Sequence, residues 1–457
     1  MSELDKHSLD EDSSIPLEQK IKIAIAVILS IVLGVLAFFA LRTVDTTTPP
    51  TASETLPEDV ELEFDALHVA KSSWRDGAWC AVDKNAVTSI QIVPTYDGSS
   101  QSAWTIDEMI FYFLEDGTVY IAVGPGVHMV GSMHRAFADF VNATQITGLE
   151  LLETSMVTDM SYLFSNSKFE SIDISSWDTA RVSNFSHILY DTHYTYTVNM
   201  DNLNLSNVVD ASYLFANCTA VSELFFRNVD TSHILNMEGM FMNVGAVAFK
   251  GATVLYGTID TSSCVNMSHM FNTARLANMT DVVKTFDTSN VTNMEAMFYH
   301  SLNLFELDLS GWNVSKVTNM TDMFNDIVCL QHVNMEGWSP LSLEKADRMF
   351  RNCNNLLAFT QWDSAPNIQS TESMFENCFE IKELDVTCFD GATIENAEKM
   401  FYGLEFVKNI YCNGFTVTNH AYDMFAWCIS IQGPTAYDET KISSEMTTTI
   451  GYFTPTK

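Results

Sequence analysis

Two hydrophobic periods follow one another within the stretch LDLSGWNVSKVTNMTDMF at 307–324. Its first half alternates apolar and polar residues, which is the period of a strand with one buried face. After a polar turn, Met320, Met323 and Phe324 stand at the i, i+3, i+4 spacing of a helix. The stretch therefore predicts a strand, a turn and a short helix. FDTSNVTNMEAMF at 286–298 has nearly the same pattern, so the unit recurs.

The recurrence extends through most of the chain. We call the Phe or Leu that ends each unit its anchor, and the residue before it is mostly Met. Successive anchors are 24 to 30 residues apart, with a mean near 26. Self-similarity at such a period is typical of a solenoid whose units stack to share one core. The anchors predicted from the sequence are Phe140, Phe164, Leu189, Phe215, Phe241, Phe271, Phe298, Phe324, Phe350, Phe375, Phe401 and Phe425.

Two further columns support this interpretation. Large apolar residues precede many anchors by twelve positions, and their phase predicts burial as core plugs rather than exposure as sugar-binding rings. The plugs include Trp177, Phe286, Trp312, Trp338 and Phe389. Asn or Asp stands five residues before most anchors, where its side chain is expected to accept a hydrogen bond from the first free amides of the helix. That column is Asp159, Asn184, Asp210, Asn236, Asn266, Asn293, Asn319 and Asn396.

The fold class predicted from these patterns is an α/β solenoid of about eleven to twelve strand-turn-short-helix coils. Strand-like runs at 89–94 and 118–124 predict a β-rich N-terminal cap, and the interval between Phe241 and Phe271 is expected to bulge as a surface loop. The predicted domains are a tail at 1–22, a membrane segment at 23–41, a stalk at 42–63, the cap at 64–139, the array at 140–425 and a C-terminal cap at 426–457.

The membrane segment is predicted from IAIAVILSIVLGVLAFFAL at 23–41, nineteen residues without a charge. As a helix it spans roughly 28 Å, close to the hydrocarbon thickness of a bilayer. Lys20 and Lys22 precede it and Arg42 follows, which favours a cytoplasmic N-terminus and an external array. A cleaved signal peptide is the alternative. Both interpretations export the remainder of the chain, and the Thr- and Pro-rich residues 42–63 are typical of an extended stalk.

Composition and charge restrict the partners. The chain has 457 residues, 47% of them apolar, which is enough for a large folded core. Its 58 acidic and 23 basic residues give a formal charge of −35. Such a chain repels phosphate backbones, so nucleic acid is not an expected partner.

Candidate chemistry is sparse, and the sequence predicts no catalytic, cofactor-binding or metal-binding residue. No H-E-x-x-H, G-x-S-x-G or phosphate-loop motif occurs. An enzyme hidden in residues 64–139 is therefore the least favoured function. A calcium ladder is an alternative use of the Asp residues that follow the plugs, but Asp in such turns usually accepts hydrogen bonds from nearby amides. These residues are Asp178, Asp230, Asp260, Asp287, Asp363 and Asp390.

Nine cysteines raise the question of disulfides in an exported chain. Four of them follow an anchor by three residues, which predicts a column of buried thiols rather than bridges. Cys353 and Cys378, on adjacent coils, are the pair with which a bridge is best tested. The column is Cys218, Cys353, Cys378 and Cys428.

The pattern LDLSxWxxSxVTNMxxMFxxCxxL resembles that of the BspA-type leucine-rich-repeat surface proteins of host-associated bacteria and some protists. The resemblance covers about 140–430. It implies a leucine-rich-repeat-like solenoid displayed on the cell surface that binds a protein or glycan on host or neighbouring cells, without enzyme activity. A structural coat whose arrays assemble laterally is the alternative function. Ala346, Thr371, Ala397 and Ala421 depart from the family pattern by replacing its inner Met.

Overall fold

The computed structural model describes residues 74–455, except 97, 99, 107, 108, 248–250, 302, 361 and 449. The chain divides into two compact units, Met1–Phe64 and Asp65–Lys457, and the described residues belong to the second. The predicted tail, membrane segment and stalk lie outside the described residues. Within the described part of the chain, no helix has the length and apolarity needed to cross a bilayer.

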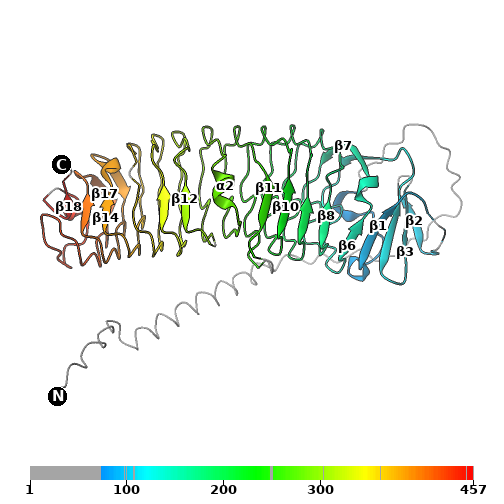
Figure 1. Cartoon of the computed structure of the whole chain (residues 1–457), viewed down its shortest axis with the longest axis horizontal. Coiled ribbons are helices and arrows are strands. Elements are labelled where there is room, and N and C mark those ends of the chain that lie inside the picture. The colour runs from blue at the N-terminus through cyan, green and yellow to red at the C-terminus, as the bar shows by residue number, and fades with distance from the viewer. Residues whose placement is uncertain are drawn as a thin grey trace, which may run out of the picture. The chain divides into compact units, whose positions relative to one another are not determined.

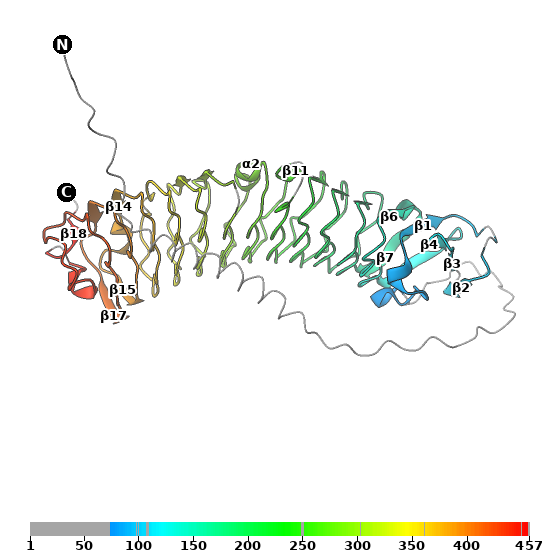
Figure 2. The same cartoon turned by 90° about the horizontal axis from the view of Figure 1, so that it is seen from below.

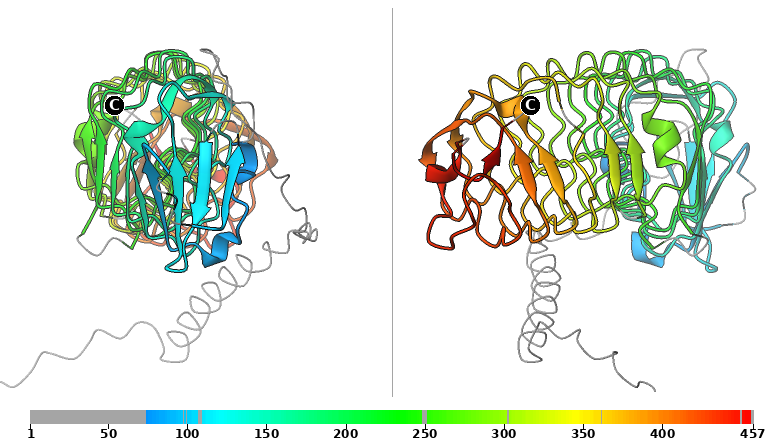
Figure 3. Two further views of the ribbon diagram at one scale, coloured as in Figure 1. Left: turned by 90° about the vertical axis from the view of Figure 1, so that its right-hand side faces the viewer. Right: turned by 60° about the vertical axis from the view of Figure 1, so that its left-hand side comes forward.

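The described residues form a β-solenoid of about twelve coils with almost no helix. Coil follows coil along one axis from the N-terminal sheet to β18 (Figures 1 and 2). Seen along that axis, the coils have closely similar outlines and share one interior (Figure 3). The predicted stacking of repeats is confirmed, whereas the leucine-rich-repeat-like α/β class is wrong.

The short helices predicted at the Met-Phe segments are absent from the described coils, and turns replace them. Within one coil, the amide of Met323 donates to the carbonyl of Met320, three residues back, at 3.2 Å. The alternate amides of Asp322 and Phe324 donate instead to the next coil, to Asp347 O at 2.8 Å and Met349 O at 2.9 Å. An α-helix needs consecutive amides to bond four residues back. Here every second amide bonds to a neighbouring coil, so no helix forms.

Two columns of residues with positive φ impose these turns. One column stands two residues after the anchor, which in the first coil is Phe137, and is mostly Asn, Asp or Gly, the residues that adopt left-handed backbone most readily. It is Asp139, Asn166, Asp191, Asn217, Asn243, Thr273, His300, Asp326, Asn352, Asn377, Gly403 and Trp427. We call the other the outer column, which stands two residues before the anchor. It is Arg135, Tyr162, His187, Tyr213, Gly239, His269, Ala296, Asp322, Arg348, Ser373, Lys399 and Asp423.

The predicted cap residues make the expected type of hydrogen bond, but in a different element. The side chain of Asn184 accepts from the amide of Ser186 at 3.1 Å, and that of Asn319 accepts from Thr321 at 3.0 Å. Each bond closes a turn instead of starting a helix. The same column forms isolated parallel bridges from coil to coil, which connect β7 (Glu153–Asp159) to β15 (Thr393–Asn396).

The predicted strands form parallel sheets along one side of the coils. The four-stranded sheet has the order β11-β10-β9-β8, and α2 (Met279–Val283), the α-helix among the described residues, interrupts the series before β12 (Figure 1). β11 forms within the interval that was expected to bulge. The strands are β8 (Ser171–Asp173), β9 (Thr197–Asn199), β10 (Glu223–Phe226), β11 (Val254–Gly257), β12 (Glu306–Asp308), β13 (His332–Asn334), β14 (Glu383–Asp385), β16 (Asn409–Tyr411) and β18 (Phe453–Thr454).

A five-stranded sheet of order β2-β3-β4-β1-β6 covers the N-terminal end, and β1 and β4 are the two strands predicted there. Its strands are β1 (Ser89–Val93), β2 (Ala103–Ile106), β3 (Met109–Phe113), β4 (Thr118–Ala122) and β6 (Gln145–Thr147). β5 (His128–Ser132) pairs with β7, and β17 (Thr416–His420) pairs with β15. Short 3₁₀ turns are η1 (Arg75–Gly77), η2 (Lys84–Ala86), η3 (Leu149–Leu151), η4 (Thr387–Phe389) and η5 (Ser444–Met446).

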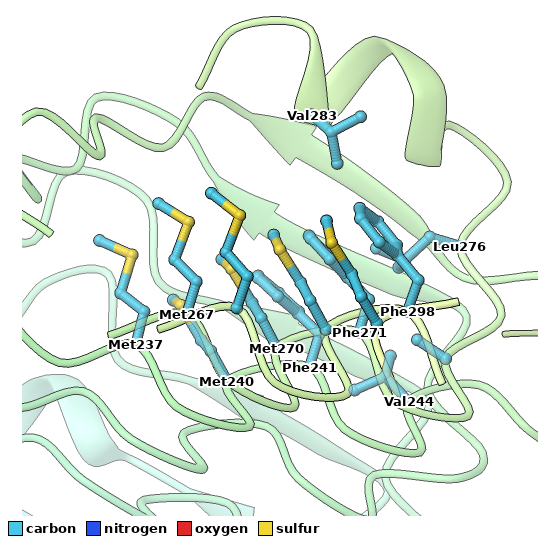
Figure 4. Close-up of a cluster of buried hydrophobic side chains, with 14 of the residues drawn as sticks. Met237, Met240, Phe241, Val244, Met267, Met270, Phe271, Leu276, Val283 and Phe298 are labelled. Carbon is cyan, nitrogen blue, oxygen red and sulfur yellow. The ribbon is translucent and has the colours of Figure 1, made fainter. Parts of the chain in front are cut away.

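The core is a ladder of like side chains. From Phe215 to Phe425, successive anchor rings stack at centroid distances of 5.1 to 6.2 Å. The methionines before them line up in the same interior (Figure 4). In the first coil the anchor is Phe137 rather than Phe140, because Phe137 is the ring that stacks on Phe164, at 5.6 Å. The stacked rings exclude water from one continuous hydrophobic core, which no single coil could form alone.

Candidate functional site

The cysteine column lies in the core as predicted. Its four thiols are free and buried, and burial raises the pKa of each. Each donates its S–H to the carbonyl of the anchor in the preceding coil. Cys353 donates to Phe324 O at 3.0 Å and Cys378 to Phe350 O at 3.0 Å. The thiols therefore satisfy core carbonyls, and a high pKa leaves them little thiolate for chemistry.

The Asp residues after the plugs mostly cap their own turns. Asp178, Asp230, Asp260 and Asp287 each accept a hydrogen bond from the amide two residues on, at 2.9 to 3.1 Å. Asp390 accepts instead from the amide of Asn413 at 2.6 Å. In the described ranges, no group of three or more His, Cys, Asp or Glu side chains is arranged to hold a metal ion.

The aromatic plugs are buried and serve the stack. Trp312 and Trp338 stack at 6.3 Å, and their indole N–H groups donate to Val283 O at 3.1 Å and Leu309 O at 2.9 Å. Both side chains are almost fully buried. Both indole rings therefore belong to the core and cannot bind a ligand at the surface. Their burial confirms the prediction from their apolar phase.

A different set of rings reaches the surface. We call His134, Tyr162, His187, Tyr190 and Tyr213 the aromatic stripe. All five are partly exposed, and they come from four consecutive coils. The rings of Tyr162 and His187 stack at 4.3 Å, and those of His187 and Tyr213 at 4.9 Å. His134 meets Tyr162 edge-on at 5.5 Å, while Tyr190 contacts Tyr162 and His187.

The backbone explains how the stripe is held. Tyr162, His187 and Tyr213 belong to the outer column, with φ of 56°, 57° and 53°. A bulky residue with positive φ is uncommon and costs of the order of 1–3 kcal/mol. Because each coil repeats this geometry, side chains of the outer column stand one above another and their rings stack. The core does not require aromatic residues here, since later coils place Arg348 and Lys399 in the same column.

A glycine ends the stripe. Gly239 occupies the outer column in the coil after Tyr213, and the Tyr213 ring lies across it. A Cβ at position 239 would stand 2.5 Å from Cδ1 of Tyr213. The Tyr213 hydroxyl donates to Oε1 of Glu238 at 2.5 Å, and burial together with this carboxylate raises the pKa of Tyr213 far above its ordinary value. The last ring is thus fixed in position.

The charge state of the stripe follows from its packing. Burial holds the pKa of His187 below its ordinary value, and it outweighs the carboxylates of Asp210 and Glu238, which act in the opposite direction. His187 is therefore neutral at neutral pH, and its Nδ1 is buried without a hydrogen-bond partner. The middle ring of the stripe is therefore an uncharged imidazole that stacks between two phenol rings.

The stripe was not predicted, because the apolar phase of the repeat indicates only the core. Its sequence signal is that Tyr162, His187 and Tyr213 stand in register two residues before successive anchors. That register is visible once the anchors are aligned. Tyr190 and His134 join them only through the tertiary structure.

The stacked coils and their ladder core define a repeat protein of the β-solenoid class. Matches to the family described as "Mycoplasma protein of unknown function, DUF285" cover 131–253, 221–331, 245–362 and 330–436, together about two thirds of the chain. The chain belongs to this family. No curated protein matches the sequence.

Proposed function

We propose that this chain is a non-enzymatic binding scaffold displayed on the cell surface, and that its aromatic stripe contacts a protein or glycan on host or neighbouring cells. The observation that carries the proposal is that three consecutive coils place stacked rings in the outer column, where the core does not need them. Aromatic side chains are favoured at binding surfaces because they bring large contact area at a low entropy cost. The resemblance to BspA-type surface proteins supports the same function.

Display on the surface follows from the apolar run at 23–41, which remains a prediction from the sequence. Protease treatment of intact cells tests it. A cell-surface array is released or shortened by the protease, whereas an array that stays intact until the cells are broken would contradict the proposed location.

The stripe is tested with the full-length chain on protein and glycan arrays and on host cells. The variant Y162N/H187N/Y213N removes three rings while placing Asn, which tolerates positive φ, in the outer column. The matched control is K399N, the same replacement in the same column of a later coil. We expect the triple variant to lose at least about tenfold in affinity, as for removal of interface aromatics, and the control to bind normally. Equal binding by both variants would contradict a role for the stripe.

Lateral assembly into a coat is a second candidate, and one observation favours it. Val209, Leu235 and Val265 stand in register on three consecutive coils and are 50%, 46% and 38% exposed. Aligned aliphatic side chains suit contact between neighbouring arrays. Replacing all three by Ser is expected to abolish ordered assembly on membranes if this candidate is right, as judged by electron microscopy of the coated surface.

A further inference from the structure

The last coil has three large apolar side chains at its surface. It carries Tyr422, Trp427 and Ile429, which are 67%, 58% and 60% exposed. Tyr422 stands where other coils have mostly Ser, Thr, Asp or Glu, and Trp427 where most have Asn or Asp. Ile429 stands in a mixed column, which has polar residues such as Lys168 and Glu405 but also the exposed Val141 and Val328.

Trp427 is the most unusual of the three. Its φ is 67°, in the column that Asn occupies at 166, 217, 243, 352 and 377. A bulky residue is strained in this conformation, whereas Asn is not. The side chain is also largely exposed, so burial in the core does not offset the strain. Strain without a structural benefit is a reason to look for a function.

The backbone edge of the last coil is also partly open. In the preceding coil, the amides of Ala397 and Lys399 donate to the carbonyls of His420 and Tyr422, at 2.8 and 3.0 Å. The equivalent amides of the last coil, those of Ala421 and Asp423, have no partner among the described residues. An open edge with exposed apolar neighbours is a template for pairing with another chain.

The C-terminal segment covers only the middle of this edge. Its Ile442 carbonyl accepts from the amide of Phe425 at 2.9 Å, and the Tyr437 hydroxyl accepts from the amide of Trp427 at 3.0 Å. Tyr452 and Phe453 pack edge-on against Phe425, at 5.2 and 5.8 Å. The core is therefore sealed, while the coil's flank remains available.

Charge indicates which partner suits this end. A second copy of a chain with a formal charge of −35 is repelled by most of its surface. Residues 399–457, however, contain four basic and five acidic residues, so this end is nearly neutral. Electrostatic repulsion between two copies that meet through this end is therefore weak.

We infer that the last coil is the surface through which two copies of this chain associate, C-terminal end to C-terminal end. The N-terminal end instead carries the β2-β3-β4-β1-β6 sheet, whose outermost strand is the antiparallel β2, so the two ends of the array present different edges. Contact between identical ends gives a closed two-fold dimer, the commonest form of homo-oligomer. This inference does not depend on the function proposed for the aromatic stripe.

The test is sedimentation of the purified full-length chain from about 1 μM to about 100 μM, the range in which weak dimers form. The variant W427N/I429S removes two exposed side chains and gives position 427 the residue that other coils use. We expect a concentration-dependent dimer for the wild type, at least about tenfold weaker association for the variant, and an unchanged or higher melting temperature. The control V328S/L357S changes two other exposed aliphatic residues on earlier coils and should leave association intact.

Hydrogen exchange provides the second measurement. The amides of Ala421 and Asp423 should exchange more slowly in the wild type as concentration rises, and not in W427N/I429S. A wild type that is monomeric throughout, a dimer that the variant leaves unchanged, or exchange at 421 and 423 that is independent of concentration would each overturn the inference. If W427N/I429S failed to fold, I429S and the wild-type exchange data would decide.

Discussion

The two halves of the array share one backbone and one core but present different chemistry from the same column. In the N-terminal half the outer column carries Tyr162, His187 and Tyr213, whose rings stack. In the C-terminal half it carries Asp322 and Arg348, which pair across adjacent coils at 2.8 and 2.9 Å. The repeat therefore fixes where an outer side chain stands, while its chemistry is free to vary.

Two further ion pairs lie near this pair in the C-terminal half of the array. Arg351 pairs with Glu376 at 3.0 Å, and Arg348 lies 4.0 Å from Glu372. These groups are partly exposed, so their contribution to stability is modest and sensitive to salt. In repeat arrays such variable surface positions carry the function, and we propose the aromatic half as the binding surface.

The largest effect should be common to both halves. Phe241→Ala and Phe375→Ala each remove one fully buried rung of the ladder. We expect each to cost about 3–5 kcal/mol in unfolding free energy, because a cavity remains where the rings stacked. Denaturation followed by far-ultraviolet circular dichroism measures this. A loss in only one half would show that the halves do not share an equivalent core.

Gly239→Ala should disturb the aromatic half specifically. The new Cβ meets the Tyr213 ring, and alanine is strained at the φ of 58° found there. We expect a loss of about 1–3 kcal/mol and a displaced Tyr213, observed as changed ring signals in NMR. Gly337→Ala is the control, since it has a φ of 83° but its Cβ would meet nothing closer than 4.0 Å. Unchanged Tyr213 signals in Gly239→Ala would contradict this packing.

Arg348→Asn should affect the ionic half, and by less. It removes both hydrogen bonds to Asp322 while keeping a residue that tolerates positive φ. We expect a loss of about 1 kcal/mol at low salt that shrinks as salt is added. Tyr162→Asn, measured in the same salt series, should show no such dependence. An equal salt response in the two variants would remove the distinction between the halves.

The smallest effect should be a pH response in the aromatic half. Because the folded pKa of His187 lies below the ordinary value of 6.5, the unfolded chain binds the proton more tightly. The stability that this group contributes is fully present above the unfolded pKa of about 6.5. It is lost as the pH falls from there towards the lower folded pKa. The carboxylates of Asp210 and Glu238 raise the pKa of His187 and so limit the effect. His187→Asn should flatten this part of the curve of melting temperature between about pH 7.5 and about pH 5. An identical slope in wild type and variant would contradict it.

The sequence by itself determined the repeat, its length and the inward phase of its apolar columns. Phe324, Met323 and Trp312 were expected in a shared core, and all three are buried there. Hydrophobic periodicity suffices for this, because a residue that recurs in register every coil must face either the core or the solvent in every coil. The buried cysteine column was predictable for the same reason.

Only the tertiary structure decided the local backbone and the surface. The spacing of Met320, Met323 and Phe324 fits both a helix and a series of turns, and the choice depends on whether an amide bonds within its own coil or to the next. The Asn and Asp residues after the anchors favour turns. In the first coil, either Phe137 or Phe140 fits the pattern, and only stacking on Phe164 selects Phe137. The stripe likewise arises when coils bring distant rings together, which is information that pairing between coils supplies and local sequence does not.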